Sequence, residues 1–463
     1  MRRGGSAPRV RRGPAAARGV RLLGTAVLAA LLLAGCDDDA PQQAPPGGDP
    51  PGEPAPEGES AAVDPAAVGV TAEPCPDAID EERGCIHLGS LVDRGEDRAS
   101  AASDQQLEAQ RDFWQRVNEG GGVGGHEIHL DDHVRDVTDD GQEQLDAFEE
   151  VVADVLAFAL LPGDATSETL ADELVAQQVA GVVPGWWSGW HADAYRRSLL
   201  LPADYSRCRA VAAGLDWYAE EVEQPLSVLG IAPAGRVADD VAGGGSAWVE
   251  AADAAWLGVT EVGRVGEGDQ QDAAVQAVIE ASPDVVILGA GPQETGEVVR
   301  KAAAQGYQGT FLGLVDTWDP ELLDAPEREQ ALVALYRHVG PWEEVASDAG
   351  VHAEEVLDAR GDEAQLTSSY LTGWLSSYPL LAVLQAAAEQ GELSRDGLVG
   401  VLEERMLDGE GALSGHDPGS AEPGRVVLST PDAQATWGLR ADTVAGAGPG
   451  TQQLDHPEAC APS

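Results

Sequence analysis

Short apolar segments alternate with longer amphipathic segments along most of the chain. The run Asp284 to Leu288 is apolar after its first residue, which is typical of a parallel strand covered on both faces. The segment Asp104 to Asn118 instead places residues such as Leu107 and Phe113 on one side of a helix. The predicted strands lie at 86–92, 126–130, 155–161, 181–183, 226–231, 259–265, 284–288, 310–315 and 330–336. The predicted helices lie at 104–118, 142–152, 169–179, 206–222, 246–257, 272–281, 295–305, 351–359 and 370–390.

This alternation of strands and helices predicts an α/β fold with parallel sheets built from βαβ units. The predicted strands form two successive runs, whereas a closed eight-unit barrel needs only about 250 residues. The region from Cys75 onward is also too long for one hydrophobic core. We therefore expect two doubly wound parallel-sheet lobes joined by a hinge.

The first 35 residues have the order of a secretory signal peptide. Arginines between Arg2 and Arg21 precede an uncharged run, Leu22 to Gly35, which is shorter than the about 20 apolar residues of a membrane span. The run ends in Leu33-Ala34-Gly35-Cys36, which resembles the lipobox of bacterial lipoproteins. The resemblance implies that Cys36 is lipidated and becomes the mature N-terminus. The alternative is an uncleaved N-terminal anchor with an incidental cysteine.

Residues 36–78 are predicted to be a disordered, acidic linker rich in Pro and Gly. Such a segment buries too little apolar surface to offset the entropy of ordering. It fits a spacer between a lipid anchor and a folded region.

The formal net charge of −52 limits the partners. Nucleic acids and anionic membrane surfaces both require basic patches, so neither is expected to bind. The acidity favours solubility instead.

Four cysteines remain once Cys36 is assigned to the lipid, and three disulfide connectivities are possible for them. Outside the cytosol an even number favours disulfides. Cys75 and Cys85 are close in sequence, and pairing them would leave Cys208 with Cys460.

Three segments resemble the branched-chain amino-acid-binding (Leu/Ile/Val-type) family of ABC-transporter substrate-binding lipoproteins, which have the type I periplasmic binding fold. They are Asn118 to Leu130 (NEGGGVGGHEIHL), Ser282 to Gly306 and Phe311 to Trp318. The resemblance covers roughly Cys85 to Leu402. It implies an extracytoplasmic, membrane-anchored receptor that is not an enzyme and that closes around a small molecule.

The family fold implies lobes that share the chain. One lobe is expected from residues 85–202 with 340–425, and the other from 203–339 with 426–463. Ligands of open parallel sheets bind outside the carboxyl ends of the strands, so the loops that follow the strands are the candidate site.

Hydroxyl groups and tryptophans in these loops are the candidate ligand residues. Thr166, Ser167 and Ser188 are suited to a carboxylate, although the first two also fit as helix caps and Ser188 as a turn serine. The resemblance implies that Asp316 binds an ammonium group, with a turn-capping role as the alternative.

Trp187 and Trp318 are candidate contacts for a cationic or aromatic ligand, with core packing as the alternative. The neighbouring tryptophans 186 and 190 make the loop 184–190 more aromatic than in the family. This departure widens the range of ligands.

No catalytic, metal or cofactor site is expected. Ser188 lacks the glycines of a nucleophile elbow, and His126 and His129 point to opposite faces of a strand. The sequence predicts a monomeric solute-binding protein that delivers an amino acid, an amide or a related amine to an ABC permease. The alternatives are a transporter-independent sensor or partner-binding lipoprotein and, less favoured, a hydrolase.

Overall fold

The computed structural model describes residues 68–93, 98–163, 166–183, 187–191, 199–202, 206–221, 226–252, 254–263, 270–340, 356, 367–407, 426–435, 437–445, 448, 450–451, 454 and 460. The predicted signal peptide, Cys36, Trp186 and all but one residue of the helix 351–359 lie outside these ranges. Ala62–Ser463 is one compact unit.

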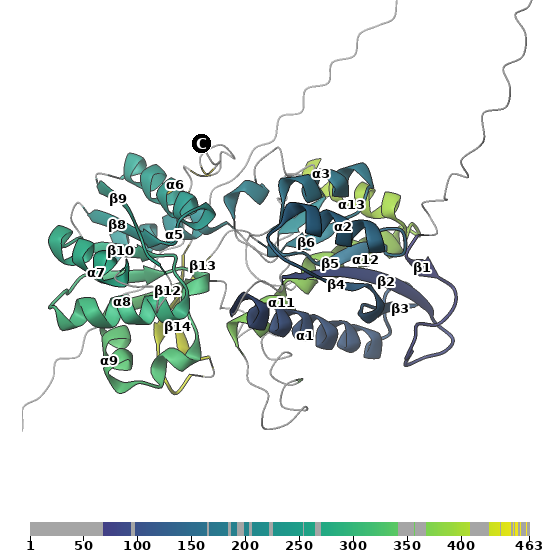
Figure 1. The fold of residues 1–463 in the computed structure, drawn as a ribbon, viewed down its shortest axis with the longest axis horizontal. Helices are drawn as coiled ribbons and strands as arrows, with labels where there is room; N and C mark the ends of the chain where they lie inside the picture. The colour runs from purple at the N-terminus through teal and green to yellow at the C-terminus, as the bar shows by residue number, and fades with distance from the viewer. Residues whose placement is uncertain are drawn as a thin grey trace, which may run out of the picture. The chain divides into compact units, whose positions relative to one another are not determined.

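The first sheet takes all its strands from the first half of the chain (Figure 1). They are β1 (Val70–Thr71), β2 (Gly84–Asp93), β3 (His126–His129), β4 (Val134–Val137), β5 (Ala157–Leu160), β6 (Gly181–Val183) and β7 (Leu200–Pro202). Their order is β1-β2-β5-β6-β7, and β3 and β4 both pair with β2. All pairs are parallel except β1 with β2. The helices around this sheet are α1 (Arg98–Glu119), α2 (Gly141–Val151), α3 (Glu168–Ala176) and, from later in the chain, α11 (Ser368–Leu375), α12 (Ser377–Glu389) and α13 (Arg395–Leu407).

The second sheet combines strands from the middle and the end of the chain. They are β8 (Ser227–Ala232), β9 (Ala255–Glu261), β10 (Val285–Leu288), β11 (Thr310–Gly313), β12 (Tyr336–Gly340), β13 (Val426–Pro431) and β14 (Leu439–Ala445). The order is β14-β13-β12-β11-β10-β8-β9, and the two C-terminal strands are antiparallel additions to a parallel sheet. The helices are α5 (Arg207–Glu221), α6 (Arg236–Ala251), α7 (Gln270–Ala281), α8 (Pro292–Ala304) and α9 (Pro326–Leu335).

Helices cover both faces of the second sheet. Along β10, Val285 and Ile287 pack in the cluster that contains α5 and α6, whereas Val286 and Leu288 pack in the cluster that contains α7 and α8. Successive strand residues point to opposite faces, and both sets are fully buried because helices cover both faces. The predicted α/β class with two doubly wound sheets is confirmed.

Several predicted elements are wrong in type or bounds; for example, the strand predicted at 259–265 is β9, which begins at Ala255 and ends at Glu261. The segment 330–336 was predicted as a strand, but it is the end of α9, and β12 begins only at Tyr336. A short apolar run is compatible with either a strand or a helix, and here its packing against other helices favours the helix. The helix expected at 246–257 is α6, which begins ten residues earlier and ends before β9.

The glycines in the middle of α6 allow close packing against α5. A Cβ atom on Gly244 would lie 2.5 Å from the carbonyl oxygen of Cys208, on α5. Glycine therefore allows α5 and α6 to approach, which the sequence pattern alone did not indicate.

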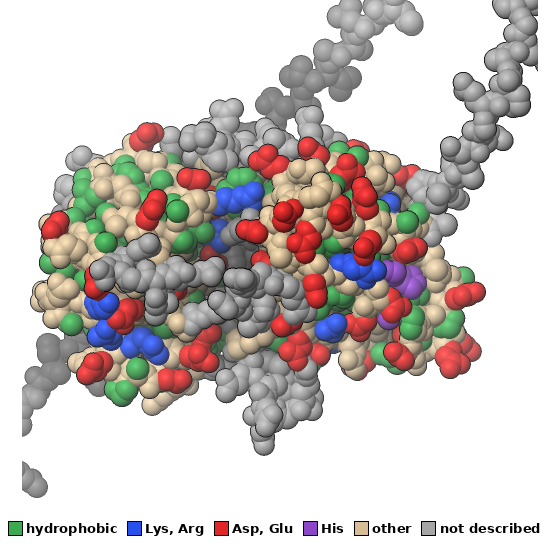
Figure 2. All heavy atoms as spheres, viewed as in Figure 1, with side chains coloured by type: hydrophobic (Ala, Val, Ile, Leu, Met, Phe, Trp, Pro, Cys, Tyr) green, Lys and Arg blue, Asp and Glu red, His purple; other side chains and the backbone are tan. Residues whose placement is uncertain are grey.

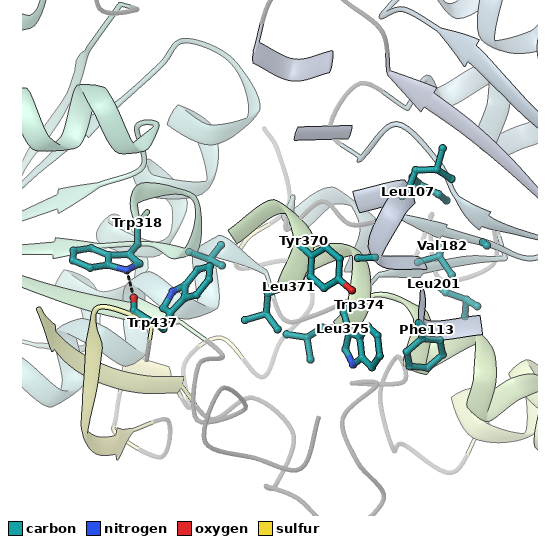
Figure 3. Close-up of a cluster of buried hydrophobic side chains, with 14 of the residues drawn as sticks. Leu107, Phe113, Val182, Leu201, Trp318, Tyr370, Leu371, Trp374, Leu375 and Trp437 are labelled. Atoms are coloured by element: carbon teal, nitrogen blue, oxygen red, sulfur yellow. Dashed lines mark hydrogen bonds between the residues drawn. The ribbon is translucent and has the colours of Figure 1, made fainter. Parts of the chain in front are cut away.

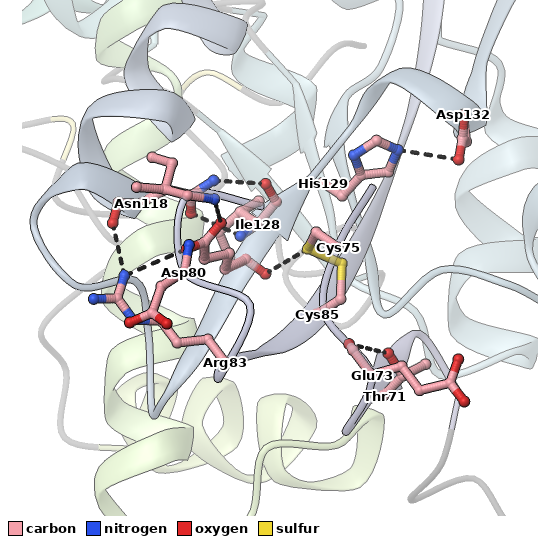
Figure 4. The surroundings of a disulfide bond; sticks show 12 residues. Thr71, Glu73, Cys75, Asp80, Arg83, Cys85, Asn118, Ile128, His129 and Asp132 are labelled. Carbon is pink, nitrogen blue, oxygen red and sulfur yellow. Dashed lines mark hydrogen bonds and ion pairs between the residues drawn. A yellow bond between two sulfur atoms is a disulfide. The ribbon is translucent and has the colours of Figure 1, made fainter. Parts of the chain in front are cut away.

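Part of the predicted linker is folded. Residues 68–78 include β1, and Cys75 forms a disulfide with Cys85 on β2 (Figure 4). The loop between these cysteines is held by the buried carboxylate of Glu127, which accepts hydrogen bonds from the backbone N–H groups of Ile79 (2.8 Å) and Asp80 (2.9 Å).

A second disulfide joins Cys208, on α5, to Cys460 near the C-terminus. The structure thus has the connectivity in which Cys75 pairs with Cys85. None of the helices in the ranges described above has the length and apolar character needed to cross a membrane.

Candidate ligand-binding site

The candidate residues of the first sheet follow β5 and β6 and lie at the carboxyl ends of these strands. Thr166 and Ser167 come after β5, and Trp187 and Ser188 come after β6. Residues at the start of α6, which follows β8 of the second sheet, contact both loops. Loops from both sheets therefore contribute to one set of contacts.

The hydroxyls of Thr166 and Ser167 have different surroundings. Ser167 is the N-cap of α3, and its Oγ accepts a hydrogen bond from the backbone N–H of Leu170 (3.1 Å). Thr166 is 0% exposed, and its Oγ1 has no hydrogen-bond partner among the residues that the structure describes. Ser167 thus has a capping role, whereas the Thr166 hydroxyl is available for a further contact.

Ser188, like Thr166, has a buried side-chain hydroxyl. It is 3% exposed, and its Oγ likewise makes no hydrogen bond within the described part of the chain. Its backbone N–H donates to the carboxylate of Asp240, on α6, at 3.1 and 3.3 Å. A buried hydroxyl without a partner costs about 1–3 kcal/mol, so two of them in adjoining loops need an explanation.

Trp187 and Trp190 form an aromatic corner, with ring centroids 4.8 Å apart and planes at 88°. Both rings are nearly buried. The guanidinium carbon of Arg236, the first residue of α6, lies 4.0 Å from the centroid of Trp187 and 5.2 Å from that of Trp190. The same guanidinium donates to the carbonyl oxygen of Thr166 at 3.4 and 3.5 Å. A cation does occupy the tryptophan-rich loop, but it belongs to the protein.

Asp316 already contacts a cation. Its Oδ2 accepts hydrogen bonds from Nε and Nη2 of Arg207, both at 2.7 Å. The side chain of Arg207 is 4% exposed and also lies 3.7 Å from the carboxylate of Asp240. The predicted ammonium-binding carboxylate is therefore part of an ion network at the start of α5 and α6.

Trp318 is a packing residue in this structure (Figure 3). It is 0% exposed, and its Nε1 donates to the carbonyl oxygen of Trp437 at 3.1 Å. Its ring stacks on Tyr336 at 5.6 Å. These contacts do not support a role in ligand binding, and the packing alternative accounts for them.

Three histidines gather at the other end of the first sheet. The rings of His129 and His133 lie 5.8 and 5.4 Å from that of His87, and His129 forms an ion pair with Asp132 at 3.1 Å. Burial is the main cause that lowers the pKa of His87 and of His133. No group of three potential ligands among the described residues has a geometry that would hold a metal ion.

Sequence reasoning missed Arg207, Arg236 and Asp240. The loop after the predicted strand 226–231 was expected at the site, and Arg236 lies only a few residues beyond that strand, so a slightly longer loop would have included it. Arg207 and Asp240 gave no comparable signal, because their role depends on the approach of α5 and α6. Figure 2 shows that acidic side chains are spread widely over the face drawn and that basic ones are few.

Comparison with known proteins places this chain in a class. Residues 86–438 match the family model of periplasmic binding proteins, so the chain belongs to the periplasmic binding protein family. Members of this family are extracytoplasmic ligand-binding proteins that work with ABC transporter permeases, not enzymes. No curated protein matches the chain.

Solved structures share the fold at low sequence identity. A fatty acid ABC transporter substrate-binding protein from Thermomonospora curvata has a TM-score of 0.66 and 19% identity, covering 83% of this chain and 96% of that one. A branched-chain amino acid ABC transporter protein from Thermus thermophilus with bound valine has a TM-score of 0.63 and 14% identity, covering 80% and 99%. Both are two-lobed proteins of the type I periplasmic binding fold, which confirms the family resemblance noted in the sequence.

Proposed function

We propose that this chain is a lipid-anchored, monomeric solute-binding protein that captures an amino acid, an amide or a related amine and delivers it to an ABC transporter. The ligand would lie between the two halves of the fold, against the loops that follow β5 and β6. The expected chain sharing, with residues 85–202 and 340–425 in one lobe and 203–339 and 426–463 in the other, is part of this proposal.

The pair of buried hydroxyls on Thr166 and Ser188 carries the proposal. Hydroxyls donate and accept hydrogen bonds, so a carboxylate or amide of a ligand would satisfy both of them. Contacts from α6 to the same loops support a closed form in which both halves touch the ligand. Such contacts are what makes a ligand favour closure.

Thr166→Val is expected to weaken ligand binding at least tenfold while leaving the free energy of unfolding unchanged or higher. The substitution preserves the shape of the side chain and removes a hydroxyl that makes no hydrogen bond within the described residues. The chain from residue 37 onward, which contains the compact unit Ala62–Ser463, would be screened by thermal shift against amino acids, amides, quaternary amines and aromatic acids. A ligand at a hundred times its dissociation constant stabilises by about 2.7 kcal/mol.

Ser376→Ala is the matched control for this experiment. Ser376 is also fully buried, but its Oγ donates to the carbonyl oxygen of Gly373 at 3.0 Å. The control should lose stability and keep its affinity for the ligand. Equal affinity in wild type and Thr166→Val would reject the assignment of the site, and no stabilisation by any compound would reject the proposed transport function.

The lipid anchor has a separate test. Cys36→Ser is expected to move the protein from the membrane fraction to the soluble fraction, because the cysteine sulfur is the proposed site of acylation. Metabolic labelling with a fatty acid and fractionation of the cells would measure this. Labelled, membrane-bound Cys36→Ser protein would show that the anchor lies elsewhere.

A further inference from the structure

The aromatic corner formed by Trp187 and Trp190 has the composition of a cation-binding site. The two indole rings are perpendicular, and the face of an indole ring attracts quaternary ammonium and guanidinium groups. The sequence accordingly indicates Trp187 as a candidate contact for a cationic or aromatic ligand, with core packing as the alternative. In the structure, the guanidinium of Arg236 lies over both rings, 4.0 and 5.2 Å from the two centroids.

We propose that Arg236 determines the specificity of the site by filling this corner with the protein's own cation, so that ligands with a quaternary ammonium or guanidinium group are excluded. The inference rests on the proposed function, because it concerns the ligand class of the same site. It leaves zwitterionic amino acids and amides as ligands and removes ligands that carry a quaternary ammonium or guanidinium group.

The position of Arg236 in the chain supports this role. It is the first residue of α6 and follows Gly235, whose φ of +91° lies in the region that favours glycine. The turn thus directs the arginine toward the loops of the other sheet. The carbonyl oxygen of Thr166 accepts from Nη1 and Nη2 of Arg236, which orients the planar guanidinium over the Trp187 ring.

Exclusion of a second cation follows from two effects. The ring faces are already covered, so an incoming cation gains no aromatic contact without displacing Arg236. A cation that enters beside Arg236 also meets a like charge in a partly buried position, where screening by solvent is weak.

Arg236→Ala tests the inference as a gain of binding. The probes are ethylguanidinium chloride, which restores the part of the side chain that the substitution removes, and tetramethylammonium chloride. We expect each to bind the variant at least tenfold more tightly than the wild type, with dissociation constants in the millimolar range. Binding would be followed by saturation-transfer NMR and thermal shift, with sodium chloride at equal ionic strength as the reference.

Two further variants define the outcome. Arg300→Ala removes an arginine from the surface of α8, where its Nη2 pairs with Glu297 at 2.7 Å, and should gain no binding. Arg236→Lys keeps a cation at this position and should also gain no binding of the probes. If the alanine variant fails to fold, the lysine variant is tested in its place, because the wild type and the lysine variant must both reject the probes. Tight binding of either probe to the wild type, or no gain in a folded Arg236→Ala protein, would overturn the inference. Neither result depends on whether an amino acid or amide binds, so the proposed function is judged separately.

Discussion

Replacing Asp216 with alanine is expected to lower the free energy of unfolding by about 3–5 kcal/mol, because a buried carboxylate that satisfies several donors is removed. Asp216 lies on α5 and is 5% exposed. It accepts hydrogen bonds from Trp248 Nε1 (2.9 Å), from the backbone N–H groups of Gly450 (2.9 Å) and Thr451 (2.8 Å), and from Thr451 Oγ1 (2.6 Å).

The effect should be local as well as global. Without the carboxylate, the amides of Gly450 and Thr451 lose their acceptor and should exchange with solvent much faster, although the Cys208–Cys460 disulfide still tethers the segment. Urea denaturation and amide hydrogen exchange would measure both changes. Asp239→Ala is the control, because Asp239 is an exposed carboxylate on α6 and should change stability by less than about 0.5 kcal/mol. A similar loss in both variants would contradict the role given to Asp216.

The sequence predicted the fold well where the apolar pattern has one interpretation. The run from Asp284 to Leu288 is apolar because both sheet faces are covered, and it forms β10 as expected. The pattern failed where an apolar run is compatible with either a strand or a helix, as at 330–336. It also failed where glycines suggest the end of a helix but instead allow two helices to pack closely. Gly244 is the example: only the approach of α5 explains it.

The candidate site was predicted in part. The rule that ligands bind at the carboxyl ends of parallel strands led to Thr166, Trp187 and Ser188, and the structure brings the loops of all three against α6. Trp187 and Trp318 were indistinguishable in the sequence, since both follow strands. Their difference lies in tertiary contacts: Arg236 covers the first, and the core surrounds the second. Residues that meet across two sheets leave no periodic signal in either segment.

His338 makes the stability of the protein depend on pH. It lies on β12, is fully buried, and its Nδ1 is 3.2 Å from the hydroxyl of Tyr336. Burial lowers the pKa of His338 to about 3, from an ordinary value of 6.5. Above pH 6.5 the histidine is neutral in both the folded and the unfolded chain and contributes no pH dependence.

As the pH falls below 6.5, the unfolded chain binds a proton at His338 and the folded chain does not, so the free energy of unfolding decreases until the folded pKa near 3 is reached. Each pH unit within this window costs about 1.4 kcal/mol, or roughly 2–3 kcal/mol between pH 6.5 and 4.5. Burial also lowers the pKa of His87 and His133, which adds to the slope in the same direction.

The substitution His338→Gln isolates the contribution of His338 to the pH dependence of the free energy of unfolding. Glutamine retains a polar group that can contact the Tyr336 hydroxyl but does not titrate, so the decrease between pH 6.5 and 4.5 should become smaller by about 2–3 kcal/mol. His126→Gln, which replaces a partly exposed histidine on β3, is the control. Urea denaturation of the three proteins at a series of pH values measures the slopes. An unchanged slope in His338→Gln would mean that the folded protein protonates His338 as readily as the unfolded chain does, and hence that the strand carrying it opens to water at low cost.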